Sequence, residues 1–219
     1  NMVIRNNGGA GLRYFGGMST HRDMKRLYGI DVYSDSTYII NCDFIRNVNY
    51  GGGHGDGVKM DQDKGAYFHV SGNRFMFNAD DGIDISGSAV AIVKNNWSFG
   101  NGVNGGDGNG FKLGAVRDST YYPLRIIVNN LAAFNYGPTR SAAGFDFPDY
   151  VDATDSTYQR ANARIYNNTS YHNDIGFLEF ENKREPYRND VYRNNIAYDN
   201  QYFQDIRVNV SVLYYPYRE

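Results

Sequence analysis

Short apolar runs recur along the chain, separated by corners rich in asparagine and glycine. Five of these runs are rich in β-branched or aromatic residues and lie at 38–40, 68–70, 90–93, 125–128 and 163–166. A glycine opens each of a second set of short runs, at 29–33, 57–60, 82–85, 110–113, 144–147 and 176–180. Runs this short predict β-strands. Apart from a turn or two near 21–27, no amphipathic pattern is long enough for a helix.

The corners carry a repeated phrase, Asn-x-x-x-x-Asn. It occurs at 73–78, 96–101, 130–135, 168–173 and 195–200, and a degenerate copy runs from Cys42 to Asn47. The first asparagines are 23, 34, 38 and 27 residues apart, and a variable period of this kind is typical of a solenoid with insertions in its loops. The sequence therefore predicts an all-β fold, a parallel β-helix. We interpret the asparagines as a structural column of stacked amides at corners where left-handed backbone is tolerated.

Composition limits the alternatives. With 219 residues the chain can bury a substantial core, and we expect a single domain over 1–219. A net charge of −2 and the lack of a long apolar stretch predict no nucleic-acid or membrane partner, and we expect a monomer. The single cysteine, Cys42, excludes an internal disulfide. The chain opens inside a repeat at Asn1–Asn6 without a signal peptide, which favours a processed or truncated N-terminus.

Acidic residues crowd into one segment, Asp80-Asp-Gly-Ile-Asp84. Aligning the runs that follow each glycine places charged residues of neighbouring coils in two columns: Asp56, Asp81 and Asn109 in one, and Lys59, Asp84, Lys112 and Asp146 in the other. Because adjacent strands lie about 4.8 Å apart, we expect Lys59 and Lys112 to flank Asp84.

Carboxylates this close repel one another unless they are protonated or bound to a cation. Hard oxygen ligands at this density suit calcium, which accepts irregular geometry and leaves positions for a substrate anion. We therefore predict that Asp56, Asp80, Asp81 and Asp84 bind Ca²⁺. Two plainer interpretations stay open: the acids decorate solvated turns, or the calcium is purely structural.

The same motifs resemble the pectate lyases of polysaccharide lyase family 9. The likeness covers about residues 36 to 180, and its most specific part is Gly106-Asp-Gly-Asn-Gly-Phe-Lys-Leu-Gly114, supported by the segments 78–84, 97–102 and 144–146. The resemblance implies a right-handed parallel β-helix, calcium bound by the four aspartates, and Lys112 as the Brønsted base. The sequence departs from the family pattern around 55–64 and after Asp146, which bears on the substrate more than on the chemistry.

The favoured function is a calcium-dependent lyase that cleaves pectate or a related uronate polysaccharide by β-elimination. Neutralising the uronate carboxylate makes the neighbouring C5 proton acidic enough to remove, and a lysine can remove it if its pKa falls toward the working pH. Asp84 and Asp146 would raise the pKa of Lys112, whereas calcium and burial would lower it. We expect the ion to dominate and the activity to lie at alkaline pH.

Other residues are weaker candidates for substrate binding: Lys59, Trp97 and Arg117. Lys59 is also the competing base, although charge balance for its acidic neighbours is the simpler role. Trp97 could stack on sugar rings or pack over a neighbouring coil. We expect His54 to be a loop residue near the groove.

Two further functions stay open. A hydrolase of the same substrates would use two aspartates as acid and base and give saturated products without calcium. A non-catalytic β-helix would bind glycan, or act as an adhesin, without turnover. The favoured interpretation makes the partner an acidic polysaccharide, pectate or rhamnogalacturonan, and the protein secreted.

Overall fold

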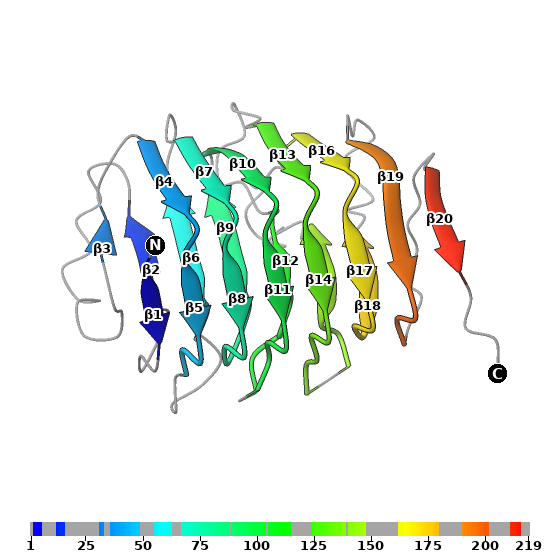
Figure 1. Ribbon diagram of the computed structural model, residues 1–219, viewed down its shortest axis with the longest axis horizontal. Coiled ribbons are helices and arrows are strands. Elements are labelled where there is room, and N and C mark those ends of the chain that lie inside the picture. Colours follow the sequence, from blue (N-terminus) through cyan, green and yellow to red (C-terminus); the bar gives the residue numbers. More distant parts are fainter. Residues whose placement is uncertain are drawn as a thin grey trace, which may run out of the picture.

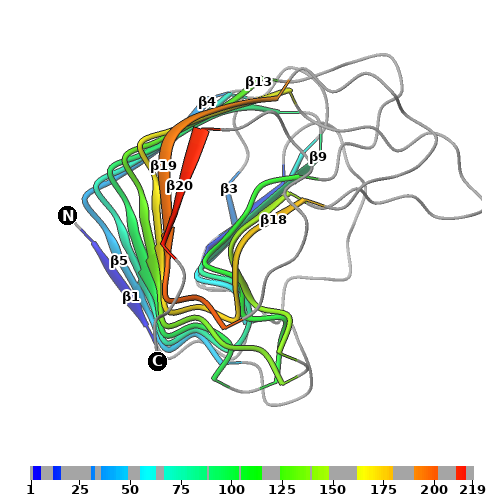
Figure 2. The ribbon, with the colours of Figure 1, turned by 90° about the vertical axis from the view of Figure 1, so that its right-hand side faces the viewer.

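The computed structural model describes residues 2–5, 12–15, 31–32, 36–48, 55–62, 67–87, 89–103, 105–114, 124–138, 140–147, 162–179, 190–201 and 211–215. All elements in these ranges are β-strands that pair in parallel (Figure 1). In Figure 1 the chain advances from left to right, running downward on the near side of the solenoid and upward on the far side. The coils therefore wind right-handed (Figures 1 and 2). The predicted parallel β-helix is confirmed. The turns expected near 21–27, as well as His54 and Arg117, lie outside the described residues.

The described strands form two hydrogen-bonded sheets, of 13 and seven strands, and Val191–Tyr198 (β19) joins two halves of the larger one. We call these halves the first and second sheets and the seven-stranded sheet the third; each complete coil contributes a strand to each of these three sides of the solenoid (Figure 2). The first sheet contains Ser36–Ile40 (β4), Tyr67–Ser71 (β7), Val90–Lys94 (β10), Leu124–Val128 (β13), Asn162–Tyr166 (β16) and the start of Val191–Tyr198 (β19). The second contains Val3–Arg5 (β1), Asp43–Ile45 (β5), Arg74–Met76 (β8), Trp97–Phe99 (β11), Leu131–Ala133 (β14), Thr169–Tyr171 (β17) and the end of β19. The third contains Asp31–Val32 (β3), Leu12–Phe15 (β2), Val58–Gln62 (β6), Ile83–Gly87 (β9), Phe111–Lys112 (β12), Ala143–Phe147 (β15) and Ile175–Glu179 (β18). Ser211–Tyr215 (β20) pairs beside β19.

Alternation along the strands builds the core. In β7, β10, β13 and β16 the second and fourth residues are buried, as expected when successive side chains point to opposite faces. In the third sheet the ring of Phe111 stacks on that of Phe145 at 5.0 Å, and Phe145 stacks on Phe177 at 4.8 Å. This interior stack means that the next residue of the strand, Lys112 after Phe111, faces outward.

Two asparagine ladders hold the corners on either side of the second sheet. The first contains Asn73, Asn96, Asn130, Asn168 and Asn195, and the second contains Asn47, Asn78, Asn101, Asn135, Asn173 and Asn200. Asn96 is typical: its Nδ2 and its backbone N–H both donate to Oδ1 of Asn130, at 2.9 and 3.0 Å. The predicted structural role of the asparagines is confirmed.

The residue before each ladder asparagine adopts left-handed backbone, for example Asn95 and Phe77, both at φ 56°. The left-handed conformation expected of the corner asparagines is therefore used one residue ahead of the stacked amide. Cys42 takes the first slot of the first ladder, where it is buried and its backbone N–H donates to Asn73 Oδ1 at 2.9 Å.

Candidate metal and catalytic site

The third sheet brings charged residues of consecutive coils together. Asp84 on β9 pairs in register with Lys59 on β6 and with Lys112 on β12. Lys112 pairs in turn with Asp146 on β15. The column predicted from the sequence is confirmed, and the two lysines flank Asp84 as expected.

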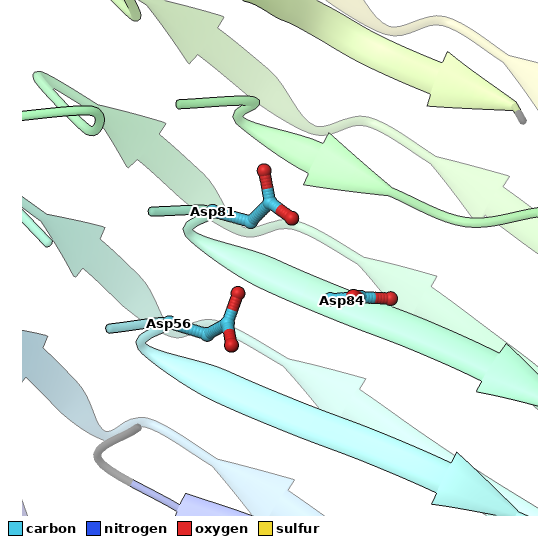
Figure 3. A group of neighbouring side chains, drawn as sticks. All are labelled: Asp56, Asp81 and Asp84. Carbon is cyan, nitrogen blue, oxygen red and sulfur yellow. The ribbon is translucent and has the colours of Figure 1, made fainter. Parts of the chain in front are cut away.

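Asp56 and Asp81 occupy equivalent corners, just before β6 and β9 (Figure 3). Asp81 Oδ1 accepts hydrogen bonds from the backbone N–H and from Nδ2 of Asn109, both at 2.9 Å. The carboxylates of Asp56 and Asp81 project toward the same side as that of Asp84 (Figure 3), and one oxygen of each lies within 4.8 Å of the other two. The structure therefore gathers three of the four predicted ligands into one group.

This three-acid group is almost fully buried, with exposures of 1% for Asp56, 0% for Asp81 and 2% for Asp84. Asp56 Oδ1 and Asp81 Oδ2 have no hydrogen-bond partner. Asp84 is better satisfied, because Lys59 Nζ donates to Oδ2 and Ser86 Oγ donates to Oδ1 at 2.8 Å. A buried carboxylate oxygen without a donor is costly, and a hard divalent cation between the oxygens would remove that cost. The donor set fits calcium.

Asp80 belongs to a second group, with Asp81 and Asp107, whose oxygens also lie within 4.8 Å of one another. The backbone N–H of Asp107 donates to Asp80 Oδ1 at 2.7 Å. Lys112 Nζ donates to Asp107 Oδ2 at 2.5 Å and lies 3.4 Å from Asp81 Oδ2. The four predicted ligands are thus divided between two overlapping groups that share Asp81. Sequence reasoning did not single out Asp107, although this residue lies in the segment Gly106–Gly114, five residues before Lys112.

Burial and mutual repulsion favour protonation of most of these acids. Burial raises the pKa of Asp56 well above its ordinary value. Burial, with the charges of Asp81 and Asp107, raises the pKa of Asp80 to about 8. Burial likewise raises the pKa of Asp81 to about 6 and that of Asp146 to about 8, although Lys112 opposes both shifts. A cation is the alternative way to compensate these carboxylates.

Asp84 and Lys112 shift toward their charged forms. Burial acts to raise the pKa of Asp84, but the charges of Lys59 and Lys112 outweigh it and lower that pKa. Burial acts to lower the pKa of Lys112, but Asp81, Asp84 and Asp107 raise it. Lys112 is therefore an ammonium in this arrangement. A cation bound by the neighbouring acids would be needed to compensate their charge and make Lys112 a base.

The weaker substrate-binding candidates lie in different places. Lys59 lies in the site, bound to Asp84. Trp97 is 54% exposed on β11 of the second sheet, between Arg74 and Leu131 in register. That sheet lies across the coil from the third sheet (Figure 2), so the structure does not bring Trp97 to the acids.

Comparison with known proteins finds similarity to pectate lyases in sequence and in fold. No protein-family model matches the chain. Pectate lyase L of Dickeya chrysanthemi and that of Dickeya dadantii (strain 3937) are each 30% identical over 184 residues, which are 78% of this chain and 39% of the relative. The crystal structure of pectate lyase Pel9A matches with a TM-score of 0.59 at 22% identity, over 96% of this chain and 44% of that one.

The chain is thus a parallel β-helix related in sequence to pectate lyases, and it spans about two fifths of the length of the curated relatives it matches. Among the described residues, no helix is long and apolar enough to cross a membrane.

Proposed function

We propose that this chain acts as a pectate lyase, a secreted calcium-dependent enzyme that cleaves pectate or a related uronate polysaccharide by β-elimination. The observation that carries the proposal is the group of Asp56, Asp81 and Asp84, which buries three carboxylates and leaves two of their oxygens without a hydrogen-bond partner. Acids that merely decorated solvated turns would not be buried in this way. The 30% identity to pectate lyase L supports the same function.

The calcium ligands in this proposal are Asp56, Asp81 and Asp84, with Asp80 beside Asp81 as the fourth. All of the donors are carboxylate oxygens, which suits a hard cation better than zinc. Calcium, when bound, neutralises the uronate carboxylate and so acidifies the proton on C5. Lys59, bound to Asp84, keeps that carboxylate charged and in place.

Lys112 is the base in this proposal. Its Nζ takes the C5 proton, the electron pair of the C5–H bond forms the C4–C5 double bond, and the bond from C4 to the glycosidic oxygen breaks. The departing oxygen takes a proton from water, so the step balances without a further reactant. Lys112 must be neutral to act, and the acids that now raise its pKa would do so less once their charge is compensated. We therefore expect activity at alkaline pH.

Incubation with polygalacturonate tests the proposal. The expected result is ultraviolet absorbance from unsaturated products, which a chelator abolishes and added calcium restores. New reducing ends without that absorbance would identify a hydrolase instead. Binding of the polysaccharide without turnover would identify a glycan-binding module, and either result would overturn the proposal.

A further inference from the structure

Two lysines flank Asp84 in equivalent register positions, yet their head groups are held differently. Lys59 and Lys112 pair with Asp84 from either side. Lys59 Nζ donates to Asp84 Oδ2, whereas Lys112 Nζ donates to Asp107 Oδ2 at 2.5 Å. Register alone therefore does not determine which lysine neutralises Asp84 and which one turns toward another acid.

The segment that carries Asp107 is fixed from both sides. The backbone N–H of Asp107 donates to Asp80 Oδ1 at 2.7 Å, and a Cβ on Gly106 would lie only 2.6 Å from Asp80 Cα. On the other side, Gly108 adopts φ +77°, and a Cβ there would lie 2.6 Å from the carbonyl oxygen of Tyr136. Close backbone approaches of this kind admit only glycine. Asp107 is therefore held in place by its neighbours on both coils.

We propose that Asp107 is a positioning residue that holds Lys112 Nζ away from the buried acids Asp81 and Asp84 and thereby makes Lys112, rather than Lys59, the base. This inference rests on the proposed lyase function. The Asp107 side chain is 54% exposed, against 18% for Lys112 and 1% for Asp81. Asp107 thus draws the ammonium toward the solvent side of the acids, which is the side from which a polysaccharide can approach.

The charges around Lys112 indicate what happens without Asp107. The nearest remaining acid is Asp81, whose Oδ2 lies 3.4 Å from Nζ and has no hydrogen-bond partner. A charge-assisted hydrogen bond is typically about 2.8 Å long, so the ammonium would close on Asp81. It would then occupy an oxygen of the three-acid group and withdraw from the substrate side.

Three variants test the proposal. Asp107→Ala should lower kcat on polygalacturonate by about 100-fold, because a catalytic group displaced by about 1 Å commonly costs that much, while KM changes by less than about threefold. Asp107→Glu should recover part of kcat, because it restores the carboxylate. Asp43→Ala is the matched control: it removes an acid that is 2.5 Å from Arg74 on the second sheet, and its kcat should equal that of the wild type.

Crystal structures of the wild type and of Asp107→Ala, each with and without calcium, give a measurement that does not depend on turnover. Lys112 Nζ should leave its wild-type position in the variant with and without calcium, and in the calcium-free variant its distance to Asp81 Oδ2 should shorten from 3.4 Å to about 2.8 Å. An Asp107→Ala variant with wild-type kcat, or with Nζ unmoved, would overturn the inference. If the wild type makes no unsaturated product, the proposed function and the base assignment fail together, while the position of Nζ still decides whether Asp107 holds the lysine.

Discussion

Two kinds of buried polar stack run along the same coils, and their side-chain chemistry differs. In the asparagine ladders each amide both donates and accepts, as Asn96 does with Asn130 at 2.9 Å. In the acid stack Asp56 and Asp81 hold equivalent corners of successive coils, but two carboxylates can only accept. A stack of amides therefore stabilises the fold, whereas a stack of acids requires protons or a cation.

Among changes at the acidic site, removal of the proposed base should have the largest effect on activity. Lys112→Ala should lower kcat on polygalacturonate by about 10²–10⁴-fold, the usual contribution of a general base. Lys59→Ala should lower it less, because Lys59 contacts Asp84 and acts through that carboxylate. Initial rates by ultraviolet absorbance measure both variants. A Lys112→Ala variant with wild-type kcat would assign proton removal to another group.

Without calcium, the buried acids of the site should make stability depend on pH. The pKa values of Asp80 and Asp146 are raised to about 8 from 3.8, so the fold favours their protonated forms. The stability they contribute is fully present below about pH 4 and is lost as the pH rises toward 8. The pKa of Asp84 is lowered, so protonation of Asp84 changes the stability only at pH values below that window.

Thermal unfolding in chelator should therefore show lower stability at pH 8 than at pH 5, by an amount on the order of a few kcal/mol. Calcium should stabilise the protein more at pH 8 than at pH 5, and Asp146→Asn should flatten the profile. A chelated protein whose stability rises between pH 5 and pH 8 would contradict the protonated state of these acids.

A single substitution can give the acid stack the chemistry of the ladders. Asp81→Asn keeps an oxygen to accept from Asn109 and adds a donor within the three-acid group. Calcium affinity should fall by about 100-fold or more, since loss of outer partners alone costs 10–100-fold. In chelator the variant should unfold at a higher temperature than the wild type, because one buried charge has been removed. Titration calorimetry and thermal melts measure the two effects, and unchanged calcium affinity would remove Asp81 from the ligand set.

The converse substitution breaks a ladder. Asn130 donates to Val93 O and Asn168 Oδ1, both at 2.9 Å, and accepts from the backbone N–H and Nδ2 of Asn96. Asn130→Ala should lower the free energy of unfolding by about 3 kcal/mol, because buried partners lose their bonds. Chemical denaturation measures the loss, with Asn162→Ala on β16 as the control for a half-buried asparagine. The kcat of the folded variant should not change, and a loss of kcat without a loss of stability would contradict the structural role.

The smallest effect should come from completing a ladder. Cys42→Asn supplies an amide that can join the existing bond from its backbone N–H to Asn73 Oδ1. We expect a gain of up to about 1 kcal/mol in the free energy of unfolding, the typical value of one hydrogen bond. Chemical denaturation checks it against Cys42→Ser, and a loss of stability would mean that this slot favours a small apolar side chain.

The sequence predicted two of the three sheets. Strands of the first and third sheets carry apolar runs of β-branched and aromatic residues, as in Val90–Lys94 and Ala143–Phe147. Strands of the second sheet are three-residue segments inside the asparagine phrase, such as Trp97–Phe99 and Leu131–Ala133. Three residues are too few to display a period, and this is why the second sheet was not predicted and why the side on which Trp97 lies could not be foreseen.

The residues of the site likewise include some that the sequence predicted and one that it did not. The column of Lys59, Asp84 and Lys112 follows from register, since each residue stands at the same offset from a glycine that opens a third-sheet strand. Asp107 does not belong to any column. Its contact with Lys112 depends on how the chain returns over Asp80, and a tertiary contact of this kind leaves no periodic trace in the sequence.

The ladders also indicate where this chain can change during evolution. Both advance by the same steps of 31, 23, 34, 38 and 27 residues. Every difference in coil length therefore falls between the second asparagine of one coil and the first asparagine of the next. Insertions there add loops without shifting the stacked amides, whereas a single residue added between the paired asparagines would dislocate both ladders. Loop exchange between relatives, confined to that stretch, is accordingly the natural route to altered specificity.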